Sequence, residues 1–175
     1  QNEAQRAFGN GEVFIEKYLK KPRHIEIQVF GDGHGKVVHL YSRDCSLQRR
    51  YQKIIEEAPA KNLSSDKLEE IQQICVKACS ELKYEGAGTL EFLYENNEFY
   101  FIEMNTRIQV EHTVTEMITG VDLVQAQLEL GLENKFSLQQ EDLRINGHAM
   151  QCRINAEDPE TFIPSPGKIT TVHRP

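Results

Sequence analysis

Two segments of the sequence alternate apolar and polar residues on both sides of a short turn, and this pattern constrains the fold more than any other feature. The first segment spans residues 24–41 and turns at the glycine-rich stretch 31–35. The second spans residues 89–104 and turns at 95–98. Alternation on either side of a turn predicts a β-hairpin. Because hairpin strands are antiparallel, the chain is expected to contain an antiparallel sheet.

Helical periodicity predicts three helices, at about 66–83, 112–119 and 122–131. The first two have sequences with capping-box spacing near their starts, Asp66 with Glu69 and Thr113 with Glu116. The apolar stripe of the first helix is expected to comprise Ile71, Ile74, Cys75, Ala78 and Leu82.

Further strands are predicted at 13–19 and 147–154, so that strands and helices are mixed and the fold class is α+β. The chain carries 20 Lys and Arg against 27 Asp and Glu, a net charge of −7. This acidic balance argues against a general nucleic-acid-binding protein. With no apolar run of about 18 residues, the sequence also predicts no membrane span.

Two glutamates inside the second hairpin, Glu91 and Glu103, are the clearest chemical signal. If position 95 pairs with 99 around a three-residue loop, paired positions sum to 194 and Glu91 lies opposite Glu103. Opposed carboxylates repel unless a cation lies between them, and oxygen ligands favour Mg²⁺ or Mn²⁺. Asn105 is expected to add an oxygen on the face that Phe101 and Glu103 share. A solvated face with two unrelated glutamates is the alternative, and a one-residue slip would separate them.

The segment after this hairpin places Arg107, Gln109 and Glu111 at every second position. A planar guanidinium, an amide and a carboxylate beside a metal would form a site for a small oxyanion. Taken alone, the segment would be interpreted as a charged loop before a helix.

The same segment belongs to a long motif, EMNTRIQVEH at 103–112, which is followed by TEMITGVDL at 115–123. Together they resemble the biotin carboxylases, which are ATP-grasp enzymes. The resemblance continues through RDCS at 43–46, RINAEDP at 153–159 and PSPG at 164–167, and it covers nearly the whole chain. It is closest in style to the biotin carboxylase subunit of bacterial acetyl-CoA carboxylase.

The resemblance implies an ATP-dependent ligase reaction in two steps. ATP phosphorylates bicarbonate to carboxyphosphate, which then carboxylates biotin held on a carrier protein. This is the first half-reaction of acetyl-CoA carboxylase. The implied cofactors and substrates are ATP, Mg²⁺ or Mn²⁺, biotin and bicarbonate. The implied partners are a biotin carboxyl carrier protein, carboxyltransferase subunits and a second copy of the full-length enzyme in a homodimer, all in the cytoplasm.

The resemblance also assigns roles to residues that match the family's motifs. The nucleotide contacts it implies are Glu16, Lys17, Leu19, His24, Gln48, Glu91 and Glu103. The implied metal ligands are Glu91, Glu103 and Asn105, and the implied bicarbonate pocket comprises Lys53, Arg107, Gln109 and the backbone of Val110. The implied catalytic residues are Lys53, Arg107, Glu111 and Arg153. Glu111 would be the general base, and Arg153 would bind biotin and stabilise its enolate.

Two positions depart from the pattern of the acetyl-CoA type. Tyr51 stands where the family usually has a histidine that contacts nucleotide, so that contact stays open. Thr113 stands where acetyl-CoA-type sequences usually have proline and resembles the pyruvate carboxylase version. The biotin carboxylase part of a pyruvate, propionyl-CoA or methylcrotonyl-CoA carboxylase is therefore the alternative assignment.

The resemblance implies three regions: the end of an ATP-grasp lid subdomain at 1–20, the large ATP-grasp subdomain at 21–146 and the start of a C-terminal domain at 147–175. Neither end reads as a natural terminus, so we expect an internal piece, incomplete at both ends. Alone, such a piece would hold one wall of the ATP cleft and could be a binding segment without turnover. A carbamoyl-phosphate synthetase is a further alternative, against which the RINAEDP motif argues.

Overall fold

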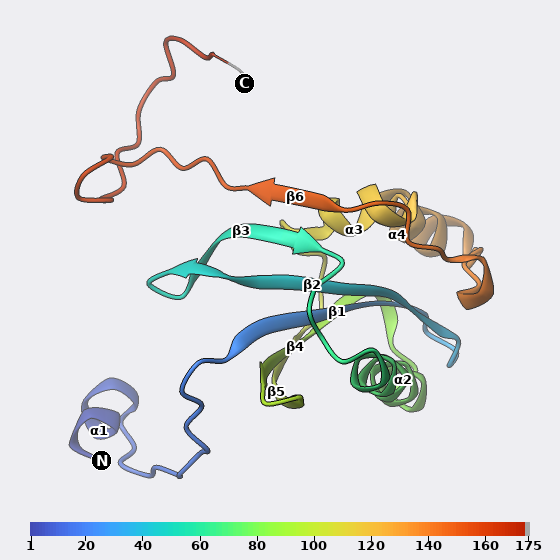
Figure 1. Cartoon of the computed structure of the whole chain (residues 1–175), viewed down its shortest axis with the longest axis horizontal. Coiled ribbons are helices and arrows are strands. Elements are labelled where there is room, and N and C mark those ends of the chain that lie inside the picture. The colour runs from blue at the N-terminus through green and yellow to red at the C-terminus, as the bar shows by residue number, and fades with distance from the viewer. Residues whose placement is uncertain (174–175) are drawn as a thin grey trace.

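One antiparallel sheet of six strands organises the chain, with the strand order β5-β4-β1-β2-β3-β6 (Figure 1). The computed structural model describes residues 1–173. Every pair of neighbouring strands is antiparallel. The strands are β1 (Arg23–Asp32), β2 (Val37–Arg49), β3 (Gln52–Ala58), β4 (Glu85–Glu95), β5 (Glu98–Asn105) and β6 (Ala149–Cys152). Both predicted hairpins and the α+β class are therefore confirmed.

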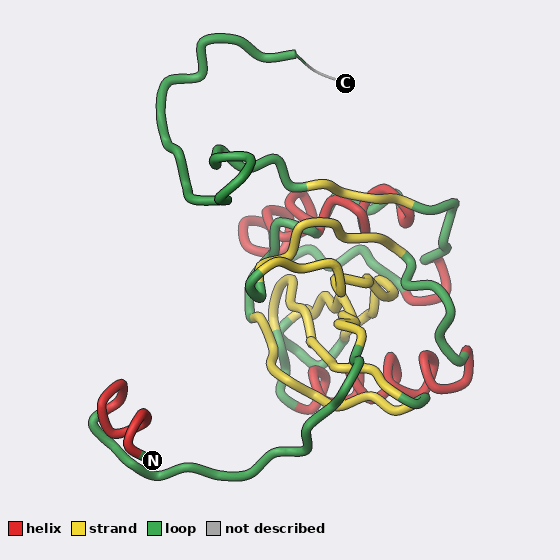
Figure 2. The backbone as a smooth tube through the Cα atoms, turned by 60° about the vertical axis from the view of Figure 1, so that its left-hand side comes forward, coloured by secondary structure: helices red, strands yellow, loops and turns green. Residues whose placement is uncertain are grey.

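The helices lie on both faces of the sheet, α2 on one side and α3 with α4 on the other (Figure 1). Their bounds are α1 (Asn2–Phe8), α2 (Ser65–Glu81), α3 (His112–Thr119) and α4 (Leu123–Glu133), with a short 3₁₀ helix η1 at Gln140–Asp142. Figure 2 shows α1 and the segment after β6 extending away from the sheet. Within residues 1–173, no helix combines the length and the apolar character that a membrane span requires.

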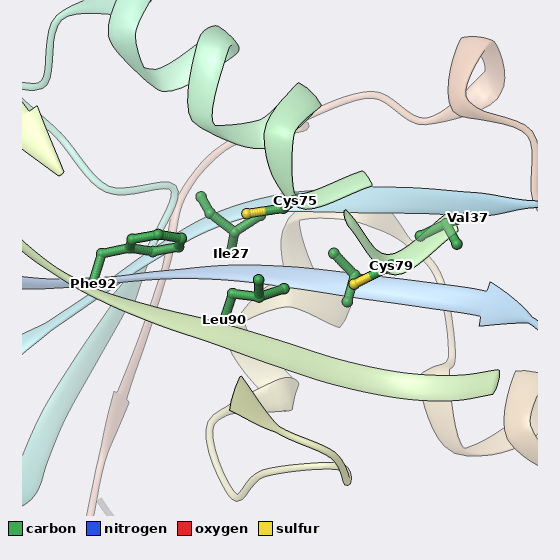
Figure 3. Packing of buried hydrophobic residues seen from close by; sticks show 7 residues of the cluster. Ile27, Val37, Cys75, Cys79, Leu90 and Phe92 are labelled. Carbon is green, nitrogen blue, oxygen red and sulfur yellow. The ribbon is translucent and has the colours of Figure 1, made fainter. Parts of the chain in front are cut away.

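Strand alternation divides the core between the two faces. Ile27 and Val29 of β1 face α2 and pack with Cys75 and Cys79. Figure 3 shows Ile27 and the two cysteines in this cluster. Fully burying one aliphatic side chain of this size contributes roughly 1.5–3 kcal/mol. The opposite face packs a second cluster against α4, comprising Phe30, Val38, Leu40, Ala87, Leu123, Leu130 and Leu143.

The second face is only partly apolar. Beside the α4 cluster, α3 packs Val114 and Ile118 against Ala58 of β3. The other positions of this face in β1 are polar, and Glu26 and Gln28 are completely buried. An apolar core cannot hold these groups unpaired, so they mark the part of the sheet where a polar site is built.

The strand predicted at 13–19 is wrong. This stretch is neither helix nor strand and is largely exposed, with Ile15 fully accessible. A strand needs a partner for its backbone hydrogen bonds, and no described strand pairs with it.

Conversely, no strand was predicted for the charged residues 43–57, where β2 continues to Arg49 and β3 follows. Here the charged side chains face a polar site instead of marking a loop.

The predicted helices are present, but their capping boxes are wrong. Ser64 is the N-cap of α2 without a side-chain cap, and Asp66 already lies in the first turn. In α3 the N-cap is Glu111, and the Thr113 hydroxyl donates to Gln151 of β6 instead. Tertiary contacts set both helix starts.

The apolar stripe predicted for α2 is only partly right. Ile74 and Leu82 are 52% and 73% exposed, whereas Cys79, which was not in the stripe, is buried. The face that packs on the sheet instead follows Leu68, Ile71, Cys75 and Cys79, a spacing of three and four residues. The helix is therefore rotated relative to the prediction.

We expect Gly31→Ala to destabilise the chain and Gly131→Ala to stabilise it. A Cβ at Gly31 would lie 2.1 Å from the backbone oxygen of Tyr84, and overpacking costs about 1–3 kcal/mol or more. Gly131 lies in α4 with open space around it, so alanine there should add about 0.5–1 kcal/mol. Urea denaturation measures both changes. Equal stability of the two variants would contradict this packing.

Stability should also fall as the pH falls from about 6.5 towards 4, because His39 is buried. Burial lowers the pKa of His39 from 6.5 to about 4. The unfolded chain therefore takes up a proton in this range before the folded chain does, which favours unfolding at the lower pH. Replacing His39 by Gln should remove on the order of 2 kcal/mol of this pH dependence. The matched control is His34→Gln, at an exposed turn residue, which should leave the contribution of His39 in place.

Candidate active site

An open cleft of about 880 Å³ lies on the partly polar face of the sheet. Strands β1 to β5 all contribute lining residues, and the segment after β5 and the residues after β6 supply the rest of the lining. The predicted site residues that line it are His24, Gln48, Lys53, Glu91, Glu103, Asn105, Arg107, Gln109, Val110, Glu111 and Arg153. The structure thus brings together residues from widely separated parts of the chain.

Three predicted nucleotide contacts, Glu16, Lys17 and Leu19, do not line this cleft. They belong to the extended segment that precedes β1. The Lys17 ammonium lies 2.5 Å from the Tyr100 hydroxyl and over the Tyr100 ring, on β5. Their predicted role therefore receives no support from their position in this structure.

Glu91 and Glu103 pair across β4 and β5, as predicted, but for a different reason. The hairpin closes with a two-residue turn, Asn96-Asn97, in which both residues have positive φ. This turn alone would place Ile102 opposite Glu91. A β-bulge between Glu91 and Phe92 shifts the register by one residue and brings Glu103 opposite Glu91.

The bulge also separates residues that strict alternation would have kept on one face. The Phe101 ring lies against the ring of Phe92, which belongs to the cluster below α2, with ring centroids 5.8 Å apart. Glu103 lines the cleft together with Asn105. The prediction that Phe101 shares the face of Glu103 is therefore wrong, because the extra residue resets the alternation.

Lys53 of β3 binds three carboxylates at the centre of the cleft. Its ammonium lies 2.9 Å from Glu91 and 2.7 Å from Glu111, and it also contacts Glu26. Burial lowers the pKa of Lys53, but these carboxylates outweigh that effect and raise the pKa above its usual value. Lys53 is therefore a permanent positive charge in the cleft.

His24 connects two of these carboxylates from the other side. Its Nε2 lies 2.8 Å from Glu91 and 3.4 Å from Glu26. Burial lowers the pKa of His24, but the two carboxylates outweigh this and raise the pKa to about 9. In this arrangement His24 is protonated at neutral pH and adds a second cation beside Glu91.

Glu91 also accepts two neutral hydrogen bonds, from the side-chain amides of Asn105 at 2.9 Å and Gln109 at 2.8 Å. Burial raises the pKa of Glu91, but His24 and Lys53 lower it further than that, so the carboxylate is ionised. Arg107, in contrast, is exposed and donates to Asn105 at 3.2 Å. Its guanidinium is thus accessible to a ligand in the cleft.

Glu111 is nearly completely buried between two cations. One oxygen lies 2.7 Å from Lys53, and the other lies 2.9 Å from Arg153. Arg153 also binds Glu56 at 2.6 Å, which fixes its guanidinium at the end of the cleft nearest β6. A carboxylate in this position can accept a proton from a ligand that approaches Lys53.

Sequence reasoning did not predict two important residues of the site, Glu26 and Arg43. Both are fully buried, and they face each other across β1 and β2. The alternation of β1 already placed Glu26 on the face of His24, which was a usable signal. Arg43 gave no such signal, because nothing local shows that β2 extends so far. Tyr51, whose nucleotide contact stays open, also lines the cleft.

The arrangement suits an oxyanion next to a polyphosphate. Lys53, Arg107 and Arg153 are three cations that line the cleft, and Gln109 adds an amide. The paired carboxylates Glu91 and Glu103, with the Asn105 oxygen, form the kind of oxygen-only set that hard divalent cations prefer.

Comparisons with known proteins agree with this geometry. Residues 1–139 match the family model described as the carbamoyl-phosphate synthase L chain, ATP binding domain. The chain therefore belongs to this family of ATP-binding domains. Within it, the chain is 61% identical to the biotin carboxylase of Haemophilus influenzae over 173 residues, which are 99% of this chain and 39% of that protein. The predicted resemblance to biotin carboxylases is confirmed, and the chain spans about two fifths of the length of such relatives.

Solved structures give the same result. The chain superimposes on a biotin carboxylase from Campylobacter jejuni, solved as a beta-gamma-ATP complex, with a TM-score of 0.88 and 51% identity. That match covers 97% of this chain and 38% of the other. The biotin carboxylase domain of the Hydrogenobacter thermophilus 2-oxoglutarate carboxylase, solved as a dimer with MgADP, ADP and bicarbonate, gives a TM-score of 0.85 and 50% identity. There the match covers 96% of this chain and 40% of the other, so the ATP-grasp fold is confirmed.

Replacing Lys53 by Met should destabilise the chain by about 3 kcal/mol at pH 7, because three carboxylates then lack their shared cation. The deficit should shrink as the pH falls towards 4.5, because carboxylates that have lost their shared cation take up protons more readily in the folded variant than in the folded wild type. Urea denaturation at the two pH values measures this. Lys77→Met, at a side chain that is 79% exposed, is the control and should change stability by less than about 0.5 kcal/mol. A pH-independent deficit would contradict the ion-pair arrangement.

Proposed function

We propose that this chain forms the bicarbonate-activating wall of the active site of a biotin carboxylase. In the full-length protein that carries the chain, ATP would phosphorylate bicarbonate, and the carboxyphosphate formed would carboxylate biotin. The observation that carries this proposal is the convergence of Lys53, Arg107, Gln109 and Glu111 with the paired carboxylates in one cleft. Phosphoryl transfer requires such a set of positioned charges around the reacting anion.

The nucleotide phosphates would lie at the β4–β5 end of the cleft. Glu91, Glu103 and Asn105 would hold Mg²⁺ or Mn²⁺ there, and the metal would offset the charge of the phosphates. His24 and Gln48 line the same cleft and are proposed nucleotide contacts. Glu16, Lys17 and Leu19 would reach the nucleotide only if the segment before β1 lay closer to the cleft than it does here.

Bicarbonate would bind between Lys53, Arg107, Gln109 and the backbone of Val110. Two of these, Lys53 and Arg107, are cations that can balance the anion and its developing charge. Glu111 would act as the general base, because its carboxylate lies 2.7 Å from the Lys53 ammonium to which the anion binds. Its other oxygen is held by Arg153, which keeps the acceptor oriented.

Biotin would approach from the β6 end, where Arg153 lies with its guanidinium fixed by Glu56 and Glu111. Arg153 would stabilise the negative charge on the biotin ureido group. The biotin would be carried by a carboxyl carrier protein in the cytoplasm, with carboxyltransferase subunits as partners and a homodimer of the full-length protein. Residues 1–20, 21–146 and 147–175 would belong to the lid, the large subdomain and the C-terminal domain.

The proposed physiological system is acetyl-CoA carboxylase. The alternatives are pyruvate, propionyl-CoA and methylcrotonyl-CoA carboxylases, because Thr113 resembles the pyruvate carboxylase version of the motif. In the structure the Thr113 hydroxyl donates to Gln151 of β6. All of them share the biotin half-reaction, so the assignment of the cleft does not depend on this choice.

Biotin-dependent release of ADP by the full-length protein, in the presence of bicarbonate and Mg²⁺, tests the proposed function. The expected result is turnover that requires biotin and bicarbonate together. ATP hydrolysis that is indifferent to both would overturn it. For the 175 residues alone we expect no turnover, since they form one wall of the cleft.

We expect Arg107→Ala to reduce the turnover of the full-length protein by about 10²–10³-fold, because the developing charge loses a cation. The KM for bicarbonate should rise, while the KM for ATP should change little. Steady-state kinetics with each substrate varied in turn measures this. Arg144→Ala is the control, since Arg144 contacts only the backbone of Leu143 among its hydrogen bonds in residues 1–173. A loss of ATP affinity with unchanged bicarbonate affinity would argue against the assigned role.

A further inference from the structure

Arg43 of β2 is completely buried, and each of its five N–H groups has an acceptor. The acceptors come from β1, from β4, from the segment after β5 and from α3, so the guanidinium joins four parts of the fold. The hydrogen bonds run to Glu26 (3.0 Å), Gln28 (2.6 Å), Thr89 (3.0 Å), Gln109 (3.0 Å) and Thr115 (3.0 Å). The guanidinium is thus fully satisfied without water.

Two of these five acceptor residues, Gln109 and Glu26, also contact residues that line the cleft. The oxygen of the Gln109 amide accepts from Arg43, so its nitrogen points the other way and donates to Glu91 at 2.8 Å. The Glu26 carboxylate uses Oε2 for Arg43 and Oε1 for Lys53. Arg43 therefore orients Gln109, which contacts Glu91, and Glu26, which contacts Lys53.

The direction of the Gln109 amide has a chemical consequence. A flipped amide would place its NH₂ group against the N–H of Arg43 and its oxygen against the Glu91 carboxylate, and both contacts would be repulsive. With Arg43 in place, Gln109 presents N–H to the cleft, and N–H is the group that an oxyanion needs. Arg43 itself does not line the cleft.

We propose that Arg43 is a positioning residue for the bicarbonate site, acting through the Gln109 amide and the Glu26 carboxylate that holds Lys53. The inference rests on the proposed function of the cleft. Lysine cannot replace arginine in this role, because its ammonium has three donors on a single nitrogen, whereas five acceptors surround the planar guanidinium here.

Arg43→Lys in the full-length protein tests the proposal. We expect the KM for bicarbonate to rise at least tenfold, while the KM for ATP stays within about twofold. The matched control is Thr115→Val, which removes one buried acceptor of the same guanidinium, on α3 and outside the cleft lining. It should lower the thermal midpoint as Arg43→Lys does, but leave the KM for bicarbonate unchanged.

A purely structural Arg43 would make the two variants alike in both readouts, which would overturn the proposal. An unchanged bicarbonate KM in a folded Arg43→Lys variant would also overturn the proposal for Arg43. The proposed function would stand in that case if the wild type were active. A wild type without biotin-dependent turnover would instead refute the proposed function itself.

If Arg43→Lys does not fold, Gln109→Glu provides a second test. The new carboxylate still accepts from Arg43, but it offers the cleft an oxygen instead of N–H. We expect the same rise in the bicarbonate KM at an unchanged ATP KM. An unchanged bicarbonate KM would show that the direction of this group is immaterial and would refute the proposal.

Discussion

A buried network of charges joins the central strands of the sheet, and the rest of the site depends on it. Arg43 and Glu26 face each other across β1 and β2 with no solvent access, and Lys53 of β3 joins Glu26 to Glu91 and Glu111. Ions buried in this way must be paired, because leaving one unpaired costs several kcal/mol. The need to satisfy every member therefore fixes the relative positions of β1, β2, β3 and β4. The same contacts place the cations and carboxylates that a phosphoryl-transfer site requires.

The apolar core supports this network from two sides. The cluster below α2 packs one face of β1 at Ile27 and Val29, and the α4 cluster covers only one end of the other face. The uncovered end is the polar stretch of β1, where Glu26 is buried by the network itself. Because backbone hydrogen bonds hold the floor of the cleft, its charged side chains gain rigid positions that a loop would not provide.

Small departures from regular geometry set the details. A single extra residue in β5 decides that Glu103 faces Glu91 and that the Phe101 ring lies against Phe92 on the other face of the sheet. The prediction that paired positions sum to 194 found the right pair although it assumed a three-residue loop. The actual two-residue turn, Asn96-Asn97, shifts the register by one residue, and the bulge shifts it back. Alternation alone identifies the candidates for a site, but a bulge can reassign any of them to the other face.

The sequence by itself determined the two hairpins, the helices, the α+β class and the membership of a known family, since period-two alternation, helical periodicity and long motifs are local signals. It also named most residues of the cleft through its resemblance to biotin carboxylases. Only the tertiary structure decided which charges meet. The central position of Arg43, the burial of Glu26 and the joining of three carboxylates by Lys53 all depend on strand order and register, and residues 13–19 are no strand because none of the described strands pairs with them. Pairing between distant segments is a property of the packed chain, and no local pattern encodes it.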